Sequence, residues 1–407
     1  MDSVDRGVAQ GSRPLVFRSS CGDESVGAVA VMQRRVLLAA GLLASSSLAA
    51  CGGLAIFSSG RAKIPDLPAL AGGGSIRQLW SSSLPGAVGF QPALAGPQVW
   101  AASPNGSVAL LDARSGQVRW RIDAGRGLVA GVGTDGQIGV VAGRDGSLIA
   151  FGIDGKQRWA VSVGAEIVTV PVVGQGLVVV RSSDNRVSAF DAASGARRWG
   201  FQRQAPPLVV RQTGALAVDA AQIYVGLPGG RMLSVASDTG AQRWEAAVSI
   251  PRGSNEIERI ADIVGTPRLV GNDVCVAAFQ GRVACLDIGT GRTLWSRDIS
   301  STAGIDVDSQ ALVVADEKGH IHAFSRTGSS LWRQEKLAGR GLLAPLLAPS
   351  HVLIGDSQGV VHLLGRDDGA LRARIDLGKP MSGPAVRVDS VALLQTQDGA
   401  LHALGFE

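Results

Sequence analysis

Histidines recur at a regular interval near the C-terminus, and imidazole is a common ligand for transition metals. His322, His362 and His402 each lie three residues after a predicted tight turn, in three consecutive sequence repeats. Equivalent positions on packed β-sheets are about 10 Å apart, whereas zinc–nitrogen bonds are about 2.0–2.1 Å long. Side chains this far apart cannot ligate one ion unless the repeats converge on a common axis. We therefore predict no metal site, and we also predict no cofactor.

Two cysteines flank one predicted hairpin. Cys275 and Cys285 lie on either side of the turn at Gln280-Gly281, so a short loop would place them opposite each other, and an oxidising compartment would permit a disulfide. Cys285, however, occupies a position that other repeats fill with alanine, which favours a role as a small core residue. The chain has no Cys-Cys pair, no Cys-x-x-Cys and no His-Glu-x-x-His motif. We predict a protein that is not an enzyme.

A third cysteine follows an export signal. Arg34 and Arg35 precede the apolar run 36–43, which is too short for a stable membrane span, and Leu48-Ala49-Ala50-Cys51 comes next. This sequence resembles a bacterial lipobox, which implies cleavage before Cys51 and acylation of that residue. Gly52 follows, where such signals usually carry aspartate for inner-membrane retention, so the resemblance implies the outer membrane. The alternative is an ordinary secretory signal with a chance cysteine.

The N-terminal region divides into a signal and a tether. Residues 1–50 comprise an upstream extension and the signal peptide, and Met32 is a natural start for the signal, although Met1 begins the sequence. The Arg34-Arg35 pair could instead belong to a twin-arginine signal, which would also export the protein. Residues 51–75 are rich in Gly, Ala, Ser and Pro, and we predict a flexible tether.

The composition indicates a folded, loop-rich protein. Of 407 residues, 55 are glycine, 45% are hydrophobic and 18% are charged, which excludes an intrinsically disordered chain. The net charge is +5, but basic and acidic residues alternate and no long basic run occurs. We predict no nucleic-acid partner.

A repeat of about 40 residues decides the fold class. Tryptophans at 80, 120, 159, 199, 244, 295 and 332 mark it, and from 120 onward each lies four residues after a glycine. Tight-turn pairs such as Asn105-Gly106 and Asp145-Gly146 run in step with the tryptophans. Two positions after each turn the residue is apolar, at 108, 148, 187, 232, 283, 321, 361 and 401. Four strands per repeat of this length are typical of a β-propeller blade.

The count of repeats predicts an all-β, eight-bladed propeller over residues 76–407. There are eight hairpins, but the strand that carries Trp80 precedes the first hairpin, and the last hairpin at Asp398-Gly399 has no tryptophan strand after it. We therefore predict that the strand from Ile76 to Ser82 completes the blade formed by residues 384–405 and closes the ring. The tryptophans are interpreted as packing between blades, without a chemical role.

One segment differs from the strands around it. In Ser254-Asn255-Glu256-Ile257-Glu258-Arg259-Ile260-Ala261-Asp262-Ile263-Val264-Gly265 the apolar residues at 257, 260, 261 and 264 follow helical spacing. The segment lies in the longest gap between tryptophans, which is 51 residues from Trp244 to Trp295. We predict a helix-like insert that projects from one face of the ring and carries binding.

The repeat resembles that of pyrroloquinoline-quinone (PQQ) dehydrogenases, and the lipobox and the insert are similar to those of the BamB family. BamB proteins are the lipoprotein propellers of the outer-membrane β-barrel assembly (Bam) machinery. The most specific match is residues 253–267, which resemble the family's Gly-Ser-x-Glu-Ile-Asp-Arg-Leu-x-Asp segment. The resemblance implies that this insert and a nearby Leu-x-Leu-Arg stretch dock the periplasmic domains of BamA, the central barrel subunit. The matching positions here are Leu208, Val210, Arg211 and Asp262.

The expected function follows from this resemblance. It implies a non-enzymatic lipoprotein scaffold on the periplasmic face of the outer membrane that binds BamA and other Bam subunits and assists insertion of β-barrel proteins. Unfolded barrel substrates are a further expected partner, held at blade edges by strand addition. A PQQ-dependent dehydrogenase is one alternative, but its resemblance implies adjacent disulfide-bonded cysteines, which this chain lacks. A generic periplasmic protein-binding propeller with another partner is the other alternative. For the insert itself, the alternative is a solvated loop that only caps the neighbouring blades.

Overall fold

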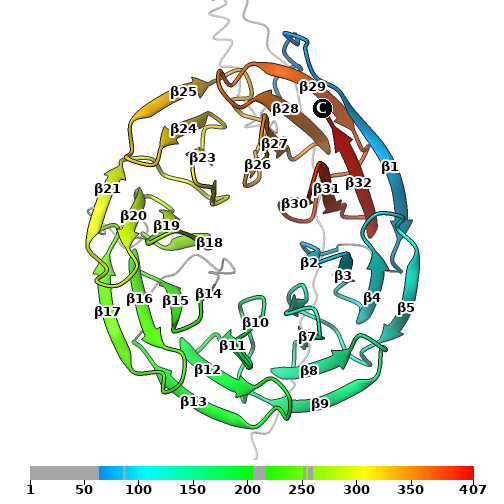
Figure 1. Ribbon diagram of the computed structural model, residues 1–407, viewed down its shortest axis with the longest axis vertical. Coiled ribbons are helices and arrows are strands. Elements are labelled where there is room, and N and C mark those ends of the chain that lie inside the picture. Colours follow the sequence, from blue (N-terminus) through cyan, green and yellow to red (C-terminus); the bar gives the residue numbers. More distant parts are fainter. Residues whose placement is uncertain (1–63, 86–88, 205–215, 251–253, 255–259) are drawn as a thin grey trace, which may run out of the picture. The chain divides into compact units, whose positions relative to one another are not determined.

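Eight four-stranded antiparallel sheets are arranged as the blades of a ring in the computed structural model (Figure 1). The structure describes residues 64–85, 89–204, 216–250, 254 and 260–407. Regular structure in these ranges consists only of strands, and none of their segments is a helix able to cross a membrane. The predicted all-β, eight-bladed propeller is confirmed.

The first four blades follow one another along the chain. Blade 1 comprises β2 (Ala93–Ala95), β3 (Gln98–Ala102), β4 (Ser107–Asp112) and β5 (Val118–Asp123). Blade 2 comprises β6 (Gly133–Thr134), β7 (Ile138–Ala142), β8 (Ser147–Gly152) and β9 (Gln157–Ser162). Blade 3 comprises β10 (Val172–Gly174), β11 (Leu177–Arg181), β12 (Arg186–Asp191) and β13 (Arg197–Gln202). Blade 4 comprises β14 (Leu216–Val218), β15 (Gln222–Leu227), β16 (Arg231–Ala236) and β17 (Gln242–Ala247).

The remaining blades repeat the pattern. Blade 5 comprises β18 (Ile263–Val270), β19 (Asp273–Ala278), β20 (Val283–Asp287) and β21 (Thr293–Arg297). Blade 6 comprises β22 (Ile305–Val307), β23 (Ala311–Ala315), β24 (Ile321–Ser325) and β25 (Ser330–Gln334). Blade 7 comprises β26 (Leu346–Leu347), β27 (His351–Gly355), β28 (Val360–Gly365) and β29 (Leu371–Asp376). Blade 8 comprises β30 (Val386–Val388), β31 (Val391–Gln395), β32 (Ala400–Phe406) and β1 (Ile76–Ser83).

The N-terminal strand closes the ring, as the count of repeats predicts. β1 pairs antiparallel with β32, from Ile76 opposite Phe406 to Ser83 opposite Ala400. Figure 1 shows the blue β1 beside the red β32 at the outer rim. Because the first and last strands share one sheet, every blade has four strands and none is left incomplete.

The core lies between blades. The middle strands are buried along nearly their whole length, as in β4, whereas the outer β5 alternates between exposed and partly buried residues. This pattern arises because each sheet packs between two neighbours while its outer strand meets solvent. The predicted apolar positions after the hairpins are all buried, namely Val108, Leu148, Val187, Met232, Val283, Ile321, Val361 and Leu401.

The repeated tryptophans join each blade to the next, which confirms their predicted packing role. The indole of Trp199 in blade 3 lies against Gly240 in blade 4, and its Nε1 donates to the carbonyl oxygen of Ser237 at 2.8 Å. The other six repeated tryptophans make the same pair of contacts one blade further on. The preceding blade's tryptophan therefore requires a residue without a side chain at the glycine that it contacts, which is 116, 155, 195, 240, 291, 328 or 369.

This contact predicts which glycines tolerate a side chain. A Cβ on Gly240 would lie 2.6 Å from Trp199 Cε3, whereas one on Gly176 would meet nothing within 4 Å, and both glycines have positive φ, of 70° and 72°. Gly176→Ala should lose only the cost of the left-handed backbone, about 1–2 kcal/mol. Gly240→Ala should lose about 1–3 kcal/mol more through overpacking. Urea denaturation measures both variants, and equal losses would contradict the role assigned to the indole.

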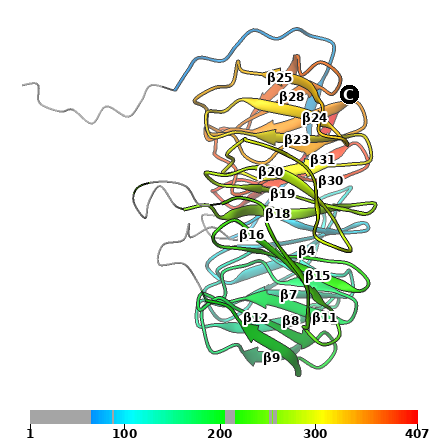
Figure 2. The ribbon, with the colours of Figure 1, turned by 90° about the vertical axis from the view of Figure 1, so that its left-hand side faces the viewer.

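The last residues of the predicted tether are hydrogen-bonded to the propeller. Ala71 N donates to the carbonyl oxygen of Leu371 at 2.7 Å, and Ser75 and Glu407 exchange backbone hydrogen bonds of 2.8 and 3.0 Å. Figure 2 shows this segment, in blue, arching over the end of the propeller that holds β25 and β28. Within residues 64–75, the chain is therefore attached to blades 7 and 8.

Candidate functional site

The insert lies between blades 4 and 5, in the linker from β17 to β18. Residues 255–259 lie outside the described residues, but Ile260–Asp262 is not helical and β18 begins at Ile263. The predicted helix is therefore wrong over its C-terminal half. Ile263 and Val264 are buried in the clusters on the two sides of blade 5, so the helical spacing reflected strand residues packed on both faces of a sheet.

Asp262 ties two blades together at the base of the insert. Its carboxylate Oδ1 accepts a hydrogen bond of 2.9 Å from the backbone N–H of Gly229, in the hairpin between β15 and β16. Its carbonyl oxygen accepts another of 2.8 Å from Phe279 N, at the end of β19. The residue is only 5% exposed. The carboxylate thus holds the end of the insert against the blade 4 hairpin.

A buried arginine from blade 3 lies near the same carboxylate. Burial lowers the pKa of the Arg181 guanidinium, and the charge of Asp262 opposes that shift. Arg181 also donates to Asn185 Oδ1 at 3.4 Å. The insert is predicted to project from the ring, but Asp262 at its end is packed between blades. There its charge faces the N–H of Gly229 and the guanidinium of Arg181, which compensate its burial.

The other residues singled out from the sequence cannot be placed. Leu208, Val210 and Arg211 lie in 205–215, and Cys51 lies before residue 64, all outside the described residues. The structure therefore shows only one member of the predicted docking set. That member, Asp262, is buried.

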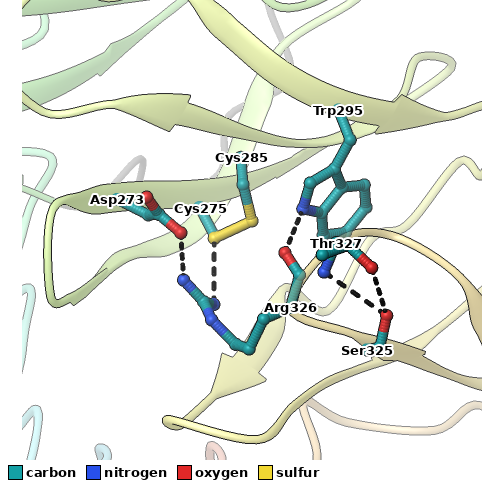
Figure 3. The surroundings of a disulfide bond; sticks show 7 residues. All are labelled: Asp273, Cys275, Cys285, Trp295, Ser325, Arg326 and Thr327. Carbon is teal, nitrogen blue, oxygen red and sulfur yellow. Dashed lines mark hydrogen bonds and ion pairs between the residues drawn. A yellow bond between two sulfur atoms is a disulfide. The ribbon is translucent and has the colours of Figure 1, made fainter.

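Cys275 and Cys285 form a disulfide, which corrects the preferred interpretation of Cys285 as an ordinary core residue. The two residues face each other across β19 and β20, and both are fully buried. Arg326 of blade 6 lies beside the bond, with one nitrogen 3.8 Å from Cys275 Sγ and another paired with Asp273 (Figure 3). Trp295 Nε1 donates to the carbonyl oxygen of Arg326 at 2.9 Å. The disulfide therefore belongs to the interface between blades 5 and 6.

The three regularly spaced histidines are bound within their own blades. His322 Nε2 lies 3.0 Å from Asp316 Oδ2, His362 Nε2 lies 3.1 Å from Asp356 Oδ2, and His402 Nε2 lies 3.1 Å from Thr396 Oγ1. Each partner precedes its histidine by six residues, across the hairpin turn. The regular spacing of the three histidines therefore reflects a contact within each blade, and not one ion shared by all three.

In blade 7 this arrangement includes a buried arginine. Arg340 Nε donates to Asp356 Oδ2 at 2.6 Å, and its Nη1 donates to the carbonyl oxygen of Pro65 at 2.5 Å. The side chains of Arg340 and Asp356 are 5% and 0% exposed. Burial raises the pKa of Asp356, but hydrogen bonds from His362, Arg340 and backbone amides outweigh this effect and leave the pKa below its usual range. The cluster of Asp356, His362 and Arg340 therefore also holds the segment around Pro65.

The same turn contains a Gly-x-Ser-x-Gly sequence at residues 355–359. In hydrolases this motif places a serine nucleophile on a strand-to-helix turn. Here it forms the hairpin from β27 to β28, and Ser357 Oγ donates to the carbonyl oxygen of Arg340 at 2.8 Å. His362 contacts Asp356 through Nε2, and its buried Nδ1 has no hydrogen-bond partner among the described residues. The geometry is not that of a catalytic triad.

A cavity of about 330 Å³ is lined by the inner strands and their loops. Its lining includes Val132, Leu216, Gly265 and Ala344, and Arg268 is the one charged residue among the described residues that line it. Arg268 Nε lies 3.4 Å from Asp306 Oδ1. The described residues that line this cavity include no carboxylate, whereas calcium prefers carboxylate and other oxygen ligands.

These features define an eight-bladed β-propeller with tryptophan–glycine contacts between neighbouring blades and a linker insert between blades 4 and 5. The family model described as "Outer membrane protein assembly factor BamB" matches residues 104–334 and 317–407. BamB of Bordetella pertussis is 38% identical over 89% of this chain and 95% of its own length. BamB of Burkholderia pseudomallei is 38% identical over 80% and 87%, respectively. The chain belongs to the BamB family of outer membrane protein assembly factors.

Solved structures agree with this assignment. The crystal structure of BamB from Moraxella catarrhalis superposes with a TM-score of 0.75 at 28% identity, covering 81% of this chain and all of that one. Quinohemoprotein alcohol dehydrogenase from Comamonas testosteroni has a TM-score of 0.62 at 12% identity, over 81% and 76% of the two chains. The second similarity shows the propeller fold alone.

Proposed function

We propose that the protein is a non-enzymatic, lipid-anchored assembly factor on the periplasmic face of the outer membrane, where it binds BamA. The observation that carries the proposal is the match, over 89% of the chain, to a relative named as an outer membrane protein assembly factor. A rigid ring with blade-to-blade tryptophan contacts suits a scaffold, since docking residues on rigid elements lose little entropy on binding. Unfolded barrel strands would add to exposed blade edges.

The lipid anchor is proposed at Cys51. The Leu48–Cys51 sequence supports it, and the buried disulfide between β19 and β20 favours an oxidising compartment such as the periplasm. Several acyl chains on one residue would give stable attachment, which a single chain does not.

Cys51→Ser is expected to release the protein from the membrane. Without the thiol there is no acyl acceptor, so the variant should move from the detergent phase to the aqueous phase in a two-phase separation or remain uncleaved. Intact-mass measurement of the wild type should show the added acyl chains. A wild type that lacks them and enters the aqueous phase would contradict the anchor.

Docking is proposed through Leu208, Val210 and Arg211 together with the insert. Asp262 contributes by holding the insert in place, since its carboxylate is hydrogen-bonded to Gly229. The guanidinium of Arg211 is permanently charged and can form paired hydrogen bonds, which suits an interface anchor.

The competing function is that of a quinone-dependent dehydrogenase, and binding of its cofactor distinguishes the two functions directly. Addition of PQQ with Ca²⁺ should leave the melting temperature unchanged, because only a ligand that binds the folded state stabilises it. A quinone dehydrogenase of the same fold should show a clear increase under identical conditions. A saturable increase for this protein would favour the enzyme.

A further inference from the structure

One carboxylate in blade 6 faces two imidazole nitrogens. Asp316 Oδ2 lies 3.0 Å from His320 Nδ1 and 3.0 Å from His322 Nε2. The ligand atoms of these three residues all lie within 4.8 Å of one another. Each side chain is 15–17% exposed, so the cluster is reachable from solvent but largely enclosed.

The hairpin turn orients this carboxylate. Asp316 Oδ1 accepts backbone hydrogen bonds from Lys318 N at 2.9 Å and His320 N at 2.8 Å. Only Oδ2 is then directed at the imidazoles.

Blade 7 provides an internal comparison, because its turn has the same arrangement with an arginine in place of one of the two histidines. There Asp356 Oδ1 accepts from the turn amides, and Oδ2 is shared by His362 and Arg340. Arg340 lies in the preceding linker, where its carbonyl oxygen accepts from Ser357 N; the matching residue in blade 6 is Ser300, whose carbonyl oxygen accepts from Glu317 N. Serine cannot reach the carboxylate as arginine does. In blade 6 the place of the guanidinium is taken by His320.

We propose that Asp316, His320 and His322 form a binding site for a divalent transition metal of the zinc type. Two imidazoles and one carboxylate are a ligand set that zinc uses with water in the remaining position. Bonds of about 2.0–2.2 Å to zinc would separate the ligand atoms by about 3.3 Å. The two 3.0 Å contacts of Asp316 would lengthen slightly, and the two imidazole nitrogens, which lie within 4.8 Å of each other, would form the third edge of the ligand set. The metal would supply the positive charge beside the carboxylate that Arg340 supplies in blade 7.

Arg333 is the group that competes with the metal. Its Nη2 lies 3.0 Å from His320 Nδ1, a nitrogen that also faces Asp316, and a neutral imidazole nitrogen cannot both accept from one and donate to the other. The side chain is half exposed and also pairs with Glu335 Oε1 at 3.0 Å. It can therefore swing towards Glu335 and leave the nitrogen to a metal ion.

Zinc titration of the full-length, untagged protein in mild detergent tests the proposal, with a chromophoric chelator as competitor. The wild type should bind Zn²⁺ saturably, and His320→Ala should weaken that binding about tenfold or more. Arg333→Ala should tighten it, because the competing cation is gone. His402→Gln changes the histidine equivalent to His322 in blade 8 and should have no effect.

Circular dichroism confirms that each variant is folded before the titration is compared. If the wild type shows no saturable binding, or binds no more tightly than a folded His320→Ala variant, the site is not a metal site. Weaker binding by Arg333→Ala than by the wild type would also overturn the assignment.

Discussion

Arg340→Met is expected to lower the free energy of unfolding by about 3–5 kcal/mol, because it leaves the carboxylate of Asp356 buried without its cation. The carboxylate is 0% exposed and accepts from Arg340 Nε at 2.6 Å. The substitution also removes the hydrogen bond to the carbonyl oxygen of Pro65. Methionine has a volume similar to that of arginine, so the lost stability measures mainly the missing charge and not a change in packing.

The pH dependence of this loss has a defined sign. The pKa of Asp356 is lowered in the folded protein, so its contribution to stability is present above its unfolded pKa, near 4, and is lost as the pH falls through the folded pKa. The variant should therefore differ most from the wild type at neutral pH and least in acid, where the carboxylate is protonated in both.

Urea denaturation at several pH values measures this effect, with Arg158→Met as the matched control. Arg158 pairs with Asp154 at 3.0 Å but is 47% exposed, so its loss should cost less than about 1 kcal/mol. Equal losses for the two arginines, or a loss at Arg340 that does not change with pH, would contradict the role assigned to the buried pair.

Arg211→Ala is expected to weaken capture of purified BamA periplasmic domains by about 2–5 kcal/mol, because truncating one partner of a buried charge pair leaves the other unpaired. The proposed docking role predicts a change in stability within about 0.5 kcal/mol, because a docking residue meets solvent in the unbound protein. Biolayer interferometry with immobilised protein measures the binding. Arg158→Ala, in blade 2, removes an equally long cation and should bind normally.

Unlike Arg211→Ala, the variant Asp262→Ala is expected to lower the stability of the propeller. The buried carboxylate of Asp262 accepts from the partly buried backbone N–H of Gly229, so Asp262→Ala removes the partner of that donor and should cost about 1–3 kcal/mol in stability. Binding by this variant is informative only after its folded fraction is measured. Normal capture by a folded Arg211→Ala, Asp262→Ala double variant would exclude the proposed docking site.

The propeller could be predicted from the sequence because its determinants are local and repeated. Positive-φ glycines such as Gly106 and Gly146 mark the hairpins, and apolar positions at fixed distances after them reveal the core face. The closure by β1 followed from counting, since a strand without a hairpin and a hairpin without an outer strand complete each other. Each signal recurs in several blades, so one ambiguous copy does not change the result.

Several polar contacts could not be predicted because they join residues that are distant in the chain. Pro65 and Arg340 are 275 residues apart, and nothing in either local sequence indicates the other. The disulfide was obscured because Cys285 takes a position that alanine fills in other blades. Near Asp262, residues alternate between two buried faces of a sheet, and their apolar spacing also fits a helix.

The central claim is that this propeller acts as a scaffold bound to BamA, and co-purification from native membranes tests it most directly. The full-length protein is extracted in mild detergent and captured, and the accompanying proteins are quantified by mass spectrometry beside a mock capture. The account predicts that BamA accompanies the wild type in near-stoichiometric amounts and is depleted with Arg211→Ala. Recovery of folded, abundant wild-type protein without BamA above the mock level would contradict it.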